Sequence, residues 1–279
     1  MDTTLVNINL TTGVDLSLRE KVTIARMLDF LGVDIIEAGI PATGEKERAA
    51  VSLISNLGLH SRIITLNRIS LGDIRASLAC GIKDIHISAP VSDMLIKQRT
   101  GHTKQWVLDC SRSVLRYAGD HGCRVSVGAE DASRADRGFL IEFALLAREM
   151  GAERFRYADS MGILEPPAVY ECLSRLCEEL PEIDLEFQSG NAGGAAVFNS
   201  AAAVKAGARY MVTAVGGKGE PSGSADLKQS IAILGKLFAL SPKLRFNMLN
   251  RLERYVAGAA SRGLYGERKL YLTGNQQIK

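Results

Sequence analysis

The feature of this sequence that most constrains its fold is a regular alternation of short β-branched runs with amphipathic helical stretches. Eight such units follow one another over residues 6–238, about 30 residues apart. Strands that alternate with helices form a parallel sheet, because each helix returns the chain to the same end of the sheet. The pattern predicts an α/β fold, a single (β/α)8 TIM barrel; an open doubly wound sheet is the alternative.

Local signals set the expected bounds of these units. The first helix begins at a Ser17–Glu20 capping box and ends at Gly32, a residue type that suits a left-handed helix cap. We expect the barrel to occupy residues 1–240, and a C-terminal helix over 242–263 with a frayed tail to complete residues 241–279. The expected strands are residues 6–10, 35–40, 62–66, 84–88, 124–127, 154–157, 185–187 and 210–215.

Composition excludes several classes of function. The net charge is +3 and the basic residues are scattered, so neither nucleic-acid nor membrane binding is expected. Five cysteines without a CxxC pair, and an N-terminus without a signal-peptide pattern, indicate a reducing cytoplasm. Cys172 and Cys177 have the alternative interpretation of a metal or redox pair, but their spacing on one helix favours packing.

Polar side chains gather where the predicted strands end. In barrels of this kind the carboxyl ends of the strands carry the chemistry, because the loops after them converge there. Such a convergence predicts a pocket for a polar, anionic small molecule. The residues are Asn7, Asn9, Glu37, Asn67, Arg68, His86, Ser88, Glu130, Arg134, Asp159, Ser160, Gln188 and Asn191.

Several motifs, in order, give the chain a family resemblance. They are Asp-Thr-Thr-Leu at 2–5, Ile-Glu-Ala-Gly-Ile-Pro at 36–41, Ala-Pro-Val-Ser-Asp at 89–93, Gly-Ala-Glu-Asp-Ala-Ser-Arg at 128–134, Ala-Asp-Ser-Met-Gly at 158–162 and Gly-Lys-Gly-Glu-Pro-Ser-Gly at 217–223. The chain resembles the homocitrate synthase and isopropylmalate synthase family of the HMG-CoA lyase-like superfamily, most of all the nitrogen-fixation homocitrate synthases. The resemblance implies a pyruvate carboxyltransferase-like barrel that condenses acetyl-CoA with a 2-oxo acid on a divalent metal.

The chain departs from this family at the positions that carry the chemistry. Val6 stands at the catalytic arginine and Asn7 at a metal-binding aspartate, so the catalytic set is not intact. Gln188 and Gly190 stand at the His-x-His pair, and Ser224 at the last metal-binding asparagine. Hard divalent cations need anionic oxygens or imidazoles, so we expect no bound metal.

Other family positions are retained. The resemblance makes Glu37, His86, Glu130, Arg134 and Ser160 candidates for binding the oxo acid, and the alternative is a buried ion-pair network left at the barrel mouth. Gly217, Lys218, Gly219 and Glu220 are candidates for binding acetyl-CoA as co-substrate, and the alternative is a loop that only needs a flexible backbone.

These departures predict a homocitrate synthase-like pseudoenzyme, a non-catalytic or partner-dependent subunit that binds a 2-oxo acid or acyl-CoA. The family dimerises and usually continues past this chain's end, so we expect a homodimer or a heteromer with a catalytically intact paralogue. An active acyltransferase, alone or as one subunit of a split enzyme, is the alternative. A metal-independent lyase that uses Glu37 and Glu130 is a third possibility.

The alignment makes a direct prediction about the lost metal site. Restoring the five family side chains should recover tight divalent-metal binding, measurable by titration calorimetry, because it would return the carboxylate and imidazole donors. An absence of any gain would mean that the backbone geometry has changed as well. The substitutions are Val6→Arg, Asn7→Asp, Gln188→His, Gly190→His and Ser224→Asn.

Overall fold

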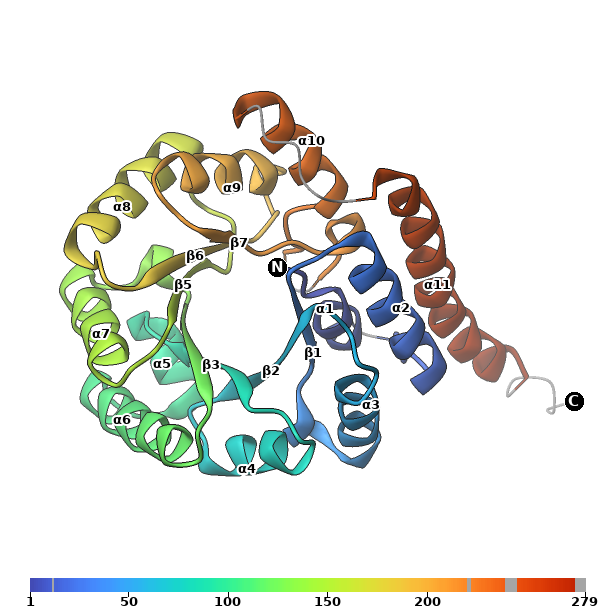
Figure 1. Cartoon of the computed structure of the whole chain (residues 1–279), viewed down its shortest axis with the longest axis horizontal. Coiled ribbons are helices and arrows are strands. Elements are labelled where there is room, and N and C mark those ends of the chain that lie inside the picture. The colour runs from blue at the N-terminus through green and yellow to red at the C-terminus, as the bar shows by residue number, and fades with distance from the viewer. Residues whose placement is uncertain (12, 220–221, 239–244, 274–279) are drawn as a thin grey trace, which may run out of the picture.

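A computed structural model shows a parallel sheet curled into a ring and surrounded by helices (Figure 1). The structure describes residues 1–11, 13–219, 222–238 and 245–273. This architecture confirms the predicted TIM barrel. No helix within these ranges combines the length and apolarity needed to cross a membrane.

Seven parallel strands form the sheet, and their order in space is their order in the chain. Each strand begins within two residues of its predicted first residue, and most strands extend beyond the predicted last residue. They are β1 (Ile35–Gly39), β2 (Arg62–Arg68), β3 (Asp84–Pro90), β4 (Arg124–Glu130), β5 (Arg154–Asp159), β6 (Asp184–Ser189) and β7 (Tyr210–Met211).

Helices pack around the ring of strands. The predicted capping box is present at the start of α2, and Gly32 ends that helix with a φ of 100°. The α-helices are α1 (Thr4–Leu10), α2 (Leu18–Leu31), α3 (Glu45–Ser55), α4 (Leu71–Ala79), α5 (Asp93–Thr100), α6 (Lys104–Asp120), α7 (Arg137–Glu149), α8 (Pro166–Glu179), α9 (Ala196–Lys205), α10 (Leu227–Phe238) and α11 (Leu249–Thr273). Short 3-10 turns are η1 (Pro41–Thr43), η2 (Ala132–Arg134), η3 (Val215–Gly217) and η4 (Phe246–Met248).

The first predicted strand, residues 6–10, is wrong, because this stretch is the helix α1. Its apolar–polar alternation has the period of a strand, but Leu5 and Ile8 also share one face of a helix and are both buried. The helix α5 was not predicted either, and its residues were assigned to a long loop. The C-terminal helix α11 starts later than expected; residues 242–244 and the tail from Gly274 lie outside the described residues.

Asp2 closes the ring in place of an eighth strand. It makes isolated parallel bridges to Ile36 on β1 and to Thr213 just after β7, the two edges of the sheet. Its N–H donates to the Ile35 carbonyl at 2.9 Å, and its carbonyl accepts from the Glu37 N–H at 2.9 Å. One residue therefore joins both edges of the sheet and places α1 across the barrel mouth.

The strands separate an apolar outer face from a charged interior. On β5, Phe155 and Tyr157 pack outwards, with Phe155 edge-on to Phe143 of α7 at 6.0 Å between ring centroids. The alternate residues, Arg154 and Arg156, form ion pairs across the interior. This two-residue alternation is the one expected of a barrel strand.

Asp2 makes the stability of the barrel depend on pH. Burial raises the pKa of this carboxyl to about 6, although the Thr4 N–H donates to it at 2.9 Å. Because the folded pKa lies above the unfolded one, its contribution is greatest at low pH and is lost as the pH rises through 6. Asp2→Asn should therefore raise the free energy of unfolding about 1 kcal/mol more at pH 8 than at pH 5, measured by urea denaturation. An equal effect at both pH values would contradict the shifted carboxyl.

Candidate functional site

A cavity of about 370 Å³ opens at the carboxyl ends of the strands. It lies where the sequence predicted a pocket, and the strands and the loops after them supply most of its walls. Its polar lining comes from Asn7, Glu37, Thr43, Asn67, Arg68, Ser88, Arg99, Glu130, Arg156, Ser160, Gln188 and Ser222. We call this space the mouth cavity.

A buried guanidinium forms the floor of the mouth cavity. Arg156 is 4% exposed and lies 3.1 Å from a Glu37 carboxylate oxygen, while its Nε donates to Glu186. Its Nη1 donates to the Gln188 side-chain oxygen at 3.3 Å. Arg154 pairs with the other Glu186 oxygen at 3.2 Å, so two cations balance two anions. Burial raises the pKa of Glu37, and the neighbouring Arg156 opposes that rise. Ion pairs buried this deeply depend on complete mutual pairing.

His86 lies below the cavity and does not line it. The ring is buried, and its Nδ1 is 2.8 Å from the Ser126 hydroxyl. A Cβ built on Gly128 would come within 2.5 Å of Nε2, so the ring packs directly on the backbone of β4. Burial, and then Arg156 and Arg154, hold the pKa of His86 well below its usual value. The imidazole is therefore a neutral interior group.

Arg134 and Ser160 brace a turn at the end of β4. Asp131 has a left-handed φ of 65°, and both of its carboxylate oxygens accept from Arg134 at 2.8 Å. Its N–H donates to the Ser160 hydroxyl oxygen at 3.0 Å, and Ser92 donates to its carboxylate. The Arg134 guanidinium is thus engaged in a bidentate pair, whereas the Ser160 hydroxyl also lines the cavity.

Two charged cavity residues, Arg99 and Arg156, were missed by the sequence reasoning. Glu130 is paired at 2.9 Å with Arg99, which α5 brings to the mouth. Arg99 was missed because the whole of α5 was assigned to a loop. Arg156 was detectable, since the alternation of Arg154 and Arg156 with aromatic residues predicts charges on the inner face of β5.

The residues at the four family positions for metal ligands do not form a donor set for a divalent ion. The Asn7 amide donates to the Lys218 carbonyl at 3.1 Å, and the Gln188 oxygen accepts from the Arg156 cation. Gly190 has no side chain, and the buried Ser224 hydroxyl has no hydrogen-bond partner within the described part of the chain. No cluster of three His, Cys, Asp or Glu suited to a metal ion occurs among these described residues. Neutral amides beside a guanidinium do not fit a hard cation.

Backbone from neighbouring loops fills the space around Gly190. A Cβ built there would lie 2.7 Å from the Ser160 carbonyl, 2.8 Å from the Gly162 nitrogen and 2.4 Å from the Ser222 hydroxyl. The Gly190 N–H also donates to the Asp159 carbonyl at 2.7 Å. We call this contact of the loops after β5, β6 and β7 the glycine seam. An imidazole at position 190 has no room unless the seam opens.

The glycine loop after β7 adjoins the seam. Gly217 has a φ of 63°, and its carbonyl accepts from the Ser224 N–H at 3.0 Å. A Cβ on Gly219 would approach the Asn7 amide at 3.0 Å, so this loop lies against α1. The predicted acyl-CoA candidate Glu220 lies outside the described residues.

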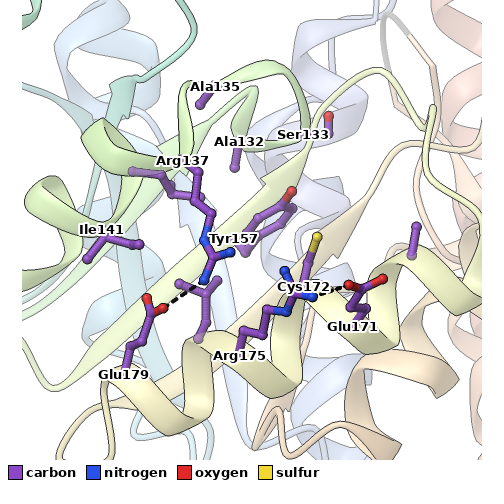
Figure 2. Close-up of a pocket in the computed structure, with 13 residues that line it drawn as sticks. Ala132, Ser133, Ala135, Arg137, Ile141, Tyr157, Glu171, Cys172, Arg175 and Glu179 are labelled. Atoms are coloured by element: carbon purple, nitrogen blue, oxygen red, sulfur yellow. Dashed lines mark hydrogen bonds and ion pairs between the residues drawn. The ribbon is translucent and has the colours of Figure 1, made fainter.

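A second cavity, of about 270 Å³, lies outside the ring between α7 and α8 (Figure 2). Its arginines are already paired, Arg137 with Glu179 at 2.8 Å and Arg175 with Glu171. None of the predicted site residues lines it. The mouth cavity therefore remains the candidate site.

The barrel and its polar mouth define a class of (β/α)8 proteins, and comparison with known proteins identifies the family. A family model described as HMGL-like matches residues 1–256. The chain is 40% identical over 237 residues to homocitrate synthase subunit alpha of Clostridium pasteurianum, covering 85% of this chain and 88% of that protein. It is 39% identical over 264 residues to 2-isopropylmalate synthase 2 of Caldanaerobacter subterraneus, covering 95% and 68%.

Solved structures show the same fold. The hydroxymethylglutaryl-CoA lyase of Pseudomonas aeruginosa superposes with a TM-score of 0.82 at 16% identity, covering 95% of this chain and 97% of that one. The carboxyl transferase domain of Rhizobium etli pyruvate carboxylase gives a TM-score of 0.75 at 17% identity, covering 95% and 47%. The chain belongs to the HMGL-like family, and its relatives by sequence include homocitrate and isopropylmalate synthases.

Because of the glycine seam, we expect the effect of a Gly→Ala substitution on stability to depend strongly on its position in this turn. Gly190→Ala should lower the free energy of unfolding by about 1–3 kcal/mol, because the new Cβ overlaps backbone atoms that cannot rotate away. Gly193→Ala in the same turn is the matched control, since a Cβ there meets nothing within 4 Å. Denaturant midpoints measure both variants. Equal midpoints would show that the seam is not closed in solution.

Proposed function

We propose that this chain is a homocitrate synthase-like subunit that binds a small carboxylate at its mouth and depends on a second polypeptide for acyl transfer. One observation carries the proposal: the positions of the family's metal ligands are occupied by an amide held by Arg156 and by the closed backbone around Gly190. A chain with this mouth has no group to polarise a 2-oxo acid by metal coordination.

The mouth retains groups suited to binding. Ser88, Ser160 and Gln188 line the same cavity as Glu37 and Glu130. Hydroxyl and amide donors hold carboxylate and carbonyl oxygens by hydrogen bonds. The proposal assigns them to orienting a ligand, with no chemical step.

Similarity to a named subunit supports the dependence on a partner. Homocitrate synthase subunit alpha of Clostridium pasteurianum is matched over 88% of its length. We propose that this chain likewise associates with another polypeptide, either a catalytically intact relative or a second copy. The partner would supply the reactive groups, and acetyl-CoA would be a co-substrate bound near Gly217 and Lys218.

A lone, active acyltransferase is the second candidate, favoured by the identity of 39–40% to synthases. It requires the chain to stabilise the developing oxyanion without the arginine that Val6 replaces. Removal of one such group typically slows a reaction by about 10²- to 10³-fold.

Release of CoA from acetyl-CoA in the presence of 2-oxo acids separates the two candidates. The purified chain alone should release CoA no faster than the no-protein blank, with or without Mg²⁺ or Mn²⁺. Addition of the polypeptide that co-purifies with it should give turnover that depends on both proteins. Metal-dependent turnover by the lone chain would overturn the proposal, and Gly190→Ala would then serve as a control for contaminating synthase.

A further inference from the structure

Four arginines line or border the mouth cavity, and three of them are fully engaged. Arg68 makes a bidentate pair with Asp73, both contacts being 2.9 Å, and Arg134 makes one with Asp131. Both pairs are local, within five residues of the chain. A ligand that took either guanidinium would leave a carboxylate that is at most 3% exposed without its cation.

Arg156 is held more firmly still. It is buried on the floor of the cavity and contacts Glu37 of β1 and Glu186 and Gln188 of β6. Withdrawing it would unbalance the interior charges of the barrel. It can present an N–H edge from below, but it cannot move towards a ligand.

Arg99 differs from the other three in its ion pair, which is a single contact, at 2.9 Å, with Glu130. Its side chain is 57% exposed, so the guanidinium can move in solvent; the more exposed Arg68, at 70%, is held by two contacts. It lies in the last turn of α5, whose first turn is fixed by the Ser92 cap and whose end is the left-handed Gly101. Its partner Glu130 is 25% exposed, so water reaches this carboxylate if the pair separates.

We propose that Arg99 is the specificity-determining residue of the mouth: it exchanges Glu130 for the distal carboxylate of a 2-oxo dicarboxylate. This inference rests on the proposed carboxylate-binding function. The other end of the ligand faces the Ser88 and Ser160 hydroxyls and the Gln188 amide, which line the same cavity. The sequence had assigned substrate carboxylate binding to Arg134, whose guanidinium braces the Asp131 turn instead.

The exchange also sets a pH dependence. The charged groups acting on Glu130 are Arg99 on α5 and Asp131 in the following turn, and its register partners on β3 and β5 are Pro90 and Ala158. Burial raises the pKa of Glu130, while Arg99 opposes the rise. A protonated Glu130 releases Arg99, so the ligand should bind more tightly as the pH falls.

Two ligands of equal chain length test the proposal by calorimetry with EDTA present. 2-Oxoglutarate and 2-oxopentanoate differ only in the distal carboxylate. The wild-type chain should bind 2-oxoglutarate on the order of tenfold more tightly, the usual effect of one charge-assisted pair. Arg99→Gln should weaken 2-oxoglutarate alone and remove the preference, and Arg99→Lys should restore part of it. Arg209→Gln is the control, because its exposed guanidinium makes a single contact with Asp184 and does not line the mouth; this variant should keep the preference.

Other outcomes overturn the proposal. Equal weakening of both ligands in Arg99→Gln would assign Arg99 a structural role. Circular dichroism would compare the helix content of this variant with that of the wild-type chain. Retention of the preference in Arg99→Gln, or absence of binding to the wild-type chain, would also overturn it. Glu130→Gln should tighten 2-oxoglutarate and make its affinity independent of pH between 5.5 and 8. Calorimetry needs neither acetyl-CoA nor a partner, so its failure is separate from failure of the CoA-release assay.

Discussion

The pairing of Arg156 with Glu37 and Glu186 is the interaction on which the rest of the mouth depends. These three side chains come from β5, β1 and β6 and are almost completely buried. A buried charge is tolerable only while its partners stay in place, so the pair fixes the positions of three strands relative to one another. The same guanidinium holds Gln188, which fixes the amide at a position where the resemblance places an imidazole.

The glycine seam extends this constraint to the loops. Gly162 and Gly190 meet at distances that no side chain tolerates, and the Ser222 hydroxyl donates to the Ser160 carbonyl at 2.9 Å across the same contact. The backbone packing in this chain leaves no room for a side chain at position 190, so the five-residue restoration predicted from the sequence would also have to open the seam. Restoring donors one residue at a time leaves that packing in place, which is why position 190 decides whether a metal site can be rebuilt.

Sequence reasoning predicted most of the fold because the strand–helix alternation is strong from residue 35 onwards. It failed at residues 6–10, where the same apolar spacing fits a strand and a helix, and only the two bridges of Asp2 decide between them. At the mouth it found Glu37, Glu130 and Ser160 but not Arg99. Which guanidinium is held by a single contact, and which by two, depends on pairings such as Arg134 with Asp131, and these become visible only in three dimensions.

We propose that the mouth binds its ligand without a metal, through the chain's own cations. Electron paramagnetic resonance of Mn²⁺ tests this most directly, because the sharp six-line signal of the hydrated ion disappears on coordination by protein. An equimolar amount of the protein should leave the signal of the free ion unchanged, with or without 2-oxoglutarate. Stoichiometric loss of the signal with the wild-type chain, and no loss with Asn7→Ala, would contradict this proposal, since a divalent ion would then be bound at the mouth.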